Sequence, residues 1–190
     1  MLFRSGLDVL LAALHQLPPD VRLWVASDGP DTPRLRAEYS HDRRIEWLGR
    51  IDDAEKVSRL KGADVFCAPS LRGESFGVVL IEAMAAGTCV VASSLDGYRN
   101  VATHEVDSVL SEPGDVDALA TSLRRVLADR ALAERLTVAG TKRALDFSMA
   151  TLAQRYTEIY HSVASPGGAQ RALSPWPLSP RLRRRTRMMA

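Results

Sequence analysis

The chain has 190 residues, 46% of them hydrophobic, which is typical of a soluble globular protein with one sizeable core. It has no run of about 18 apolar residues that could span a membrane and no signal-peptide pattern, so we expect a cytoplasmic protein. The net charge of +2 conceals a contrast, because residues 164–190 contain six arginines and no acid, which leaves −4 on the preceding residues.

Short β-branched runs alternate along the chain with longer segments of helical periodicity, and this alternation predicts an α/β fold with a parallel sheet and crossover helices. The predicted helices cover 6–17, 32–40, 52–62, 76–87, 115–129, 130–145 and 148–164. The predicted strands cover 21–27, 44–49, 63–70, 89–93 and 107–111.

Several residues that often carry chemistry are better explained here by packing. Cys67 and Cys89 each lie in a short apolar run, where a reduced cysteine behaves as a small hydrophobic residue. Trp24 and Trp47 fall on predicted strands and are expected in the core. The four histidines show no metal-ligand spacing with the cysteines, so we predict no metal site.

The segment "GESFGVVLIEAMAAGTCVV", residues 73–91, carries the clearest functional signal. It follows a predicted strand and opens a helix, at the sheet edge where doubly wound folds bind ligands. Unpaired N–H groups in the first helical turn can hold a phosphate, and Gly73 and Gly77 allow close backbone approach. Glu74 precedes the helix, and Glu82 lies two turns further on in an apolar helix. Glu82 has two explanations: a bond to sugar or ribose hydroxyls, or a structural role with a hydrogen-bonding partner or partial exposure to solvent.

This segment resembles the E-x7-E motif of the family 4 retaining glycosyltransferases, which have the two-domain GT-B architecture and use nucleotide sugars. The segments "GLDVLLAAL", "RLWVASDGP", "IEWLGRIDD", "ADVFCAPS" and "PGDVDALATSLRRVL" follow in the family's order, so the resemblance covers Arg4 to Val163. The form "ADVFCAPSLRGESFGVVLIEAMAAGT" with "SLDGYRNV" is similar to actinobacterial phosphatidylinositol mannosyltransferases, which use GDP-mannose. The resemblance implies a Rossmann-like doubly wound parallel sheet, the C-terminal half of a GT-B enzyme.

The resemblance also implies roles for individual residues. Glu74 would be the catalytic residue, bound to hydroxyls of the reacting sugar, and Glu82 would bind the ribose. Lys56 has two explanations, a neighbour of the base or phosphate and a solvated helix lysine. The residues implied for donor sugar and diphosphate are Glu74, Ser75, Phe76, Gly77, Val78 and Arg4, and those for the nucleotide are Glu82, Gly49, Ile51 and Lys56.

The expected protein is therefore a retaining hexosyltransferase domain over 1–163, with a disordered basic tail over 164–190. It would transfer a hexose, mannose from GDP-mannose or a sugar from a UDP-sugar, to a lipid or glycan acceptor such as a phosphatidylinositol-type lipid. The acceptor would be bound by an N-terminal domain that the sequence lacks. The alternative is a non-catalytic nucleotide-sugar-binding module. We expect no prosthetic cofactor, and any magnesium would act through the diphosphate. The tail has two explanations, contact with an anionic membrane and a solvated segment, and we expect no nucleic-acid partner.

Overall fold

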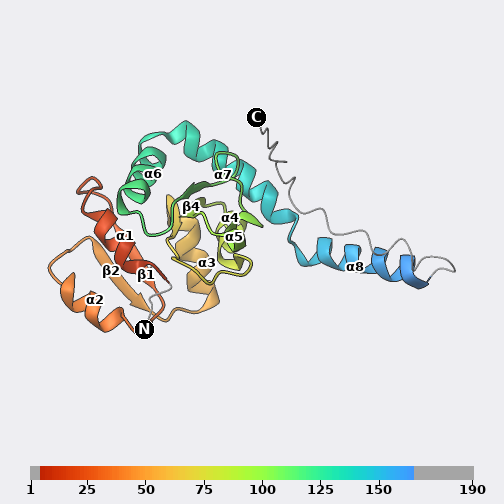
Figure 1. Cartoon of the computed structure of the whole chain (residues 1–190), viewed down its shortest axis with the longest axis horizontal. Coiled ribbons are helices and arrows are strands. Elements are labelled where there is room, and N and C mark those ends of the chain that lie inside the picture. Colours follow the sequence, from red (N-terminus) through yellow and green to blue (C-terminus); the bar gives the residue numbers. More distant parts are fainter. Residues whose placement is uncertain (1–4, 165–190) are drawn as a thin grey trace, which may run out of the picture. The chain divides into compact units, whose positions relative to one another are not determined.

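The structure is a computed structural model that describes residues 5–164. The chain divides into two compact units, with the boundary between Asp146 and Phe147. In the first unit, helices and strands alternate as Figure 1 shows. The elements are α1 (Leu7–Leu14), β1 (Leu23–Ala26), α2 (Thr32–Glu38), β2 (Ile45–Gly49), α3 (Asp53–Gly62), β3 (Val65–Ala68), α4 (Val78–Ala85), β4 (Cys89–Ser93), α5 (Asp96–Arg99), β5 (Val109–Ser111), α6 (Val116–Ala128) and α7 (Arg130–Leu145).

All the strand pairs are parallel, which confirms the predicted α/β class. β1 pairs with β2, with Leu23 opposite Ile45. The remaining described strands form a separate sheet in the order β3-β4-β5, in which Val91 of β4 lies opposite both Cys67 and Val109. The five described strands therefore form two hydrogen-bonded sheets and not one continuous sheet.

The main hydrophobic core lies on one face of the β3-β4-β5 sheet. Alternate residues of β4, such as Cys89 and Val91, point toward α1 and α6, which pack against each other over this face. In Figure 1, α1 crosses the ribbons of β1 and β2 beside α6. Since every residue of β4 is buried, both faces of the sheet are covered.

The opposite face of the same sheet is covered by α4, which packs against β4 and against α7. α7 also contributes Leu132 and Leu136 to the main core. Close approach depends on Gly140 of α7, because a Cβ there would lie 3.1 Å from Cγ of Met84. The hydroxyl of Thr141 donates a hydrogen bond to the backbone oxygen of Met84 at 3.2 Å. These contacts fix α4, the helix of the E-x7-E segment, on the body of the unit.

α3 lies beside both sheets. The Thr88 hydroxyl, just before β4, donates to the Leu60 oxygen of α3 at 2.6 Å. On the other side, the guanidinium of Arg59 lies 4.7 Å from the ring centre of Trp24 in β1. The prediction that Trp24 belongs to the core is wrong: its side chain is 39% exposed, because an arginine and the small residue Gly62 cover it in place of apolar side chains.

The observed elements follow the predicted order, and their bounds lie inside the predicted ones by up to three residues at either end. One helix was not predicted, the short α5. In the second unit, α8 (Met149–Ala164) was predicted, and its start is capped by the Ser148 hydroxyl, which accepts the Thr151 N–H at 3.1 Å.

The predicted domain boundary at residue 163 stays a prediction, and the predicted tail lies outside the described residues apart from Ala164. Within residues 5–164, none of the helices combines the length and hydropathy that a membrane span requires.

Candidate functional site

Glu74 lies in the loop that joins the end of β3 to the start of α4. Its side chain is half-buried, and its Oε1 atom accepts a hydrogen bond from the Ser70 hydroxyl at 3.1 Å. Ser70 is itself buried and lies two residues beyond the last residue of β3. Because the strands are parallel, this loop leaves the sheet at its C-terminal edge, the edge that the sequence predicted for ligand binding.

The helix α4 begins without a side-chain cap. Its N-cap residue, Gly77, has φ of 94°, a left-handed conformation that favours glycine. The residues around this start are exposed, including Ser75, Phe76 at 42% and Val78 at 57%. An uncapped helix start with an accessible surface can direct backbone N–H groups and the positive end of the helix dipole at an anion.

Glu82 forms an ion pair with Lys56 of α3, with 2.9 Å between Lys56 Nζ and Glu82 Oε1. Lys56 Nζ also lies 3.1 Å from Asp53 Oδ1. The hydrogen bonds to Glu82 and Asp53 raise the pKa of Lys56 above its ordinary value, so this residue stays protonated. The ion pair with Glu82 was not among the two explanations that the sequence gave for Lys56. For Glu82, the sequence had allowed a structural hydrogen-bonding partner as one of its two explanations.

Gly49 and Ile51 lie where β2 passes into α3. Gly49 has φ of 64°, and its backbone oxygen accepts the Ser27 N–H at 2.6 Å from the loop after β1. Ile51 is half-buried, and the next residue, Asp52, caps α3 by accepting the Glu55 N–H at 2.8 Å. The cap fixes where α3 starts and therefore where Lys56 lies, one turn further on.

The structure thus brings two groups of predicted residues to neighbouring helices. Glu74, Ser75, Phe76, Gly77 and Val78 surround the start of α4, and Glu82 joins that helix to Lys56 of α3. Glu82 is the fifth residue of α4, about 6 Å along the axis from its first residue. Arg4 lies outside the described residues.

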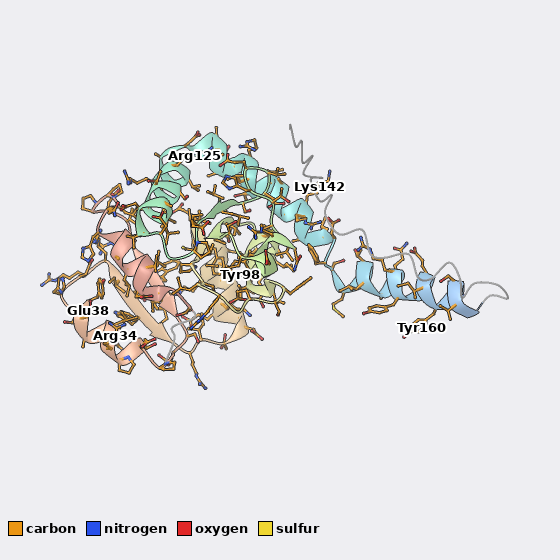
Figure 2. All side chains as sticks on the ribbon, viewed as in Figure 1. Arg34, Glu38, Tyr98, Arg125, Lys142 and Tyr160 are labelled. Atoms are coloured by element: carbon orange, nitrogen blue, oxygen red, sulfur yellow. The ribbon has the colours of Figure 1, made fainter. Side chains whose placement is uncertain are left out.

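Three residues at this site were not predicted from the sequence. Tyr98 of α5 is 1% exposed, and its hydroxyl lies 2.9 Å from Ser70 Oγ. Burial raises the pKa of Tyr98 to about 12, so the phenol keeps its proton. Gly97 packs on the Glu74 backbone, since a Cβ at Gly97 would overlap the Glu74 carbonyl. Figure 2 labels Tyr98 within the body of the first unit. The sequence offered one signal for this group: Ser70, a polar residue shortly after the apolar run of β3.

The remaining candidates for chemistry among residues 5–164 give no second site. No group of three or more His, Cys, Asp and Glu side chains in this range has a geometry suited to a metal ion. Cys67 and Cys89 are both unpaired thiols, and burial raises the pKa of each, to about 12 for Cys67. These thiols stay protonated and unreactive near neutral pH.

Comparison with known proteins places this geometry in a family. The chain is 40% identical over 168 residues to the phosphatidyl-myo-inositol mannosyltransferase of Mycobacterium leprae, an alignment covering 86% of this chain and 45% of that protein. The chain therefore spans about half the length of the curated relatives that it matches.

Solved structures agree on the fold. Sucrose-phosphate synthase from Thermosynechococcus elongatus matches with a TM-score of 0.75 and 31% identity, over 84% of this chain and 42% of that one. Anabaena HepE, crystallised with UDP-glucose, matches with a TM-score of 0.75 and 26% identity, over 83% of this chain and 45% of that one. Both are similar to this chain over one half of a larger molecule.

The model of the family described as "Glycosyl transferases group 1" matches residues 1–143, which include the whole E-x7-E segment. The chain therefore belongs to the group 1 glycosyltransferases, the family 4 type that the sequence resembled, with the fold of a GT-B glycosyltransferase domain.

Proposed function

We propose that the first unit binds a nucleotide sugar and forms the donor half of a retaining hexosyltransferase. The donor would be GDP-mannose, and the acceptor a phosphatidylinositol-type lipid. The mannosyltransferase name of the 40% identical relative supports this choice of sugar and acceptor. The same proposal includes the acceptor, retention of configuration, a cytoplasmic location and membrane contact through residues 164–190.

One observation carries the proposal: two carboxylates lie before and along one helix whose start has no side-chain cap. A nucleotide sugar has hydroxyls at the sugar end, two phosphates in the middle and hydroxyls again on the ribose. Glu74 would bind the sugar hydroxyls, the N–H groups from Gly77 and Val78 the diphosphate, and Glu82 the ribose. The order of groups along the helix matches the order along the ligand.

The catalytic contribution would come from charge. Negative charge builds on the nucleoside diphosphate as it leaves, and the start of α4 would stabilise that charge more than it stabilises the bound donor. Glu74 would contact the reacting sugar. Glu82 interacts with Lys56 and not with Glu74, so the two glutamates act as binding groups and not as the paired acid and nucleophile of a glycosidase.

Lys56 would act through Glu82. The ion pair uses Oε1 of Glu82, and the side chain is 37% exposed, so ribose hydroxyls can bond to the same carboxylate without displacing the lysine. Gly49 and Ile51 would pack against the base beside α3. Arg4 is proposed as a diphosphate contact from the sequence alone. Any magnesium would be carried to the site by the diphosphate.

Isothermal titration of the chain with GDP, GDP-mannose and UDP-glucose tests this proposal. Glu74→Gln should weaken GDP-mannose binding about tenfold or more, because the variant loses the carboxylate that binds the sugar hydroxyls. GDP has no sugar at this position, so its binding should stay unchanged. Glu82→Gln should weaken both ligands alike. Glu134→Gln, an exposed substitution on α7, is the matched control and should change neither.

Absence of binding to any nucleotide by the folded chain would contradict the proposal. The alternative, a non-catalytic nucleotide-sugar module, is separated by turnover. Mannose transfer to phosphatidylinositol vesicles, with the N-terminal half of a relative supplied, supports the transferase. Binding of GDP-mannose without transfer under those conditions supports the module.

A further inference from the structure

A row of three side chains connects the buried interior to Glu74. Ser70 Oγ lies 2.9 Å from the Tyr98 hydroxyl and 3.1 Å from Glu74 Oε1, so the serine bridges the tyrosine and the carboxylate. Tyr98 and Ser70 are buried, and Glu74 is half-buried. The three residues come from two separate segments, the loop after β3 and the helix α5.

The direction of the hydrogen bonds follows from the donors that are available. An ionised carboxylate can only accept, so the single proton of Ser70 is directed at Glu74. The oxygen of Ser70 must then accept from Tyr98, whose phenol is a donor as long as it keeps its proton. Protonation is secured because burial raises the pKa of Tyr98 to about 12. The Tyr98 hydroxyl therefore donates to Ser70 Oγ, and the Ser70 hydroxyl donates to Glu74 Oε1.

The tyrosine cannot easily move away from this position. A Cβ at Gly77 would lie 2.9 Å from Tyr98 Cδ1, so the ring already rests against the turn that starts α4. The backbone of α5 lies even closer to the loop at Gly97, where a Cβ would overlap the Glu74 carbonyl. The Tyr98 backbone oxygen accepts the Ala102 N–H at 2.8 Å, which fixes the other side of the residue.

We propose that Tyr98 and Ser70 are positioning residues that hold the Glu74 carboxylate in the orientation in which it binds the donor sugar. The Ser70 hydroxyl bonds Oε1, and the half-buried carboxylate can still accept hydrogen bonds from sugar hydroxyls. A glutamate held in this way loses less rotamer freedom when the sugar binds than one that samples several rotamers. This inference rests on the proposed function, because it assigns the orientation of Glu74 and not its ligand.

The measurement is the sugar increment, defined as the Kd for GDP divided by the Kd for GDP-mannose, with UDP and UDP-glucose titrated in parallel. Tyr98→Phe keeps the buried ring and removes only the hydroxyl. It should lower the sugar increment about three- to tenfold, as expected for the loss of one hydrogen bond, while the Kd for GDP stays unchanged. Ser70→Ala should lower it at least as much, and Ser70→Thr, which keeps a hydroxyl, should restore most of it.

A purely structural role predicts a different pattern. In that case Tyr98→Phe lowers the melting temperature and leaves the sugar increment as it was, and this result overturns the inference. A second check uses the Glu74→Gln background, in which Tyr98→Phe should have no further effect on the increment; an undiminished effect there also overturns it. If the unmodified chain binds no nucleotide, the proposed function itself fails, and the positioning role fails with it.

Discussion

Two glycines at opposite ends of α4 offer a matched test of how tightly the site is packed. Gly77 and Gly87 both have left-handed backbones, with φ of 94° and 79°. An alanine at either position suffers the same kind of backbone strain, about 1–2 kcal/mol. The surroundings differ: a Cβ at Gly87 meets nothing within 4 Å, whereas a Cβ at Gly77 lies 2.9 Å from Tyr98 Cδ1 and 3.1 Å from Val101 Cγ2.

Gly77→Ala should therefore destabilise the chain more than Gly87→Ala does. Tyr98 and Val101 are buried and cannot swing into solvent, so overpacking adds about 1–3 kcal/mol to the backbone strain. The expected loss in the free energy of unfolding is about 2–5 kcal/mol for Gly77→Ala and about 1–2 kcal/mol for Gly87→Ala.

Urea unfolding at pH 7, extrapolated linearly to water, measures both losses. Nucleotide binding gives an independent reading, because a displaced Tyr98 ring also moves the start of α4; GDP affinity should fall for Gly77→Ala and stay unchanged for Gly87→Ala. Equal losses of stability in the two variants would refute the reasoning, since they would mean that the Tyr98 contact tolerates an added methyl group.

Three further predictions concern the rest of the first unit. Leu136→Ala, in the fully buried part of α7, should lower the free energy of unfolding by about 2–5 kcal/mol in urea titrations, through lost burial and the cavity left behind. Asp115→Ala removes the cap of α6, whose Oδ1 accepts the Ala118 N–H at 2.9 Å, and should cost about 1 kcal/mol in the same assay; a loss below a few tenths would contradict the capping role. The hydrogen bonds from Arg44 lower the pKa of Asp42 from 3.8 to about 2, so the stability that this pair contributes is present above pH 4 and is lost as the pH falls toward 2. Asp42→Asn should remove that part of the pH dependence of unfolding, and an unchanged slope between pH 4 and 2 would refute the assignment.

The sequence by itself determined the class of fold, the order of the elements and the segment that carries the site. These features are local: β-branched runs, helical periodicity and the E-x7-E spacing can each be read within about 20 residues. β4 and α7 even have the predicted bounds, because β4 is a short apolar run that ends at Ser93 and α7 follows directly on its cap, Asp129. The short α5 was not predicted, because a helix of four residues is too short to show helical periodicity in the sequence.

Only the tertiary structure decided which residues meet. The pair between Lys56 and Glu82 joins residues 26 positions apart, and the row from Tyr98 to Ser70 spans 28 positions. No pattern along the chain reports such contacts, because they depend on how α3 and α5 pack beside α4. Likewise, the sequence placed Trp24 on a strand but could not tell that an arginine would cover it. Local periodicity fixes each element, and the packing of elements distant in sequence fixes the chemistry that their side chains share.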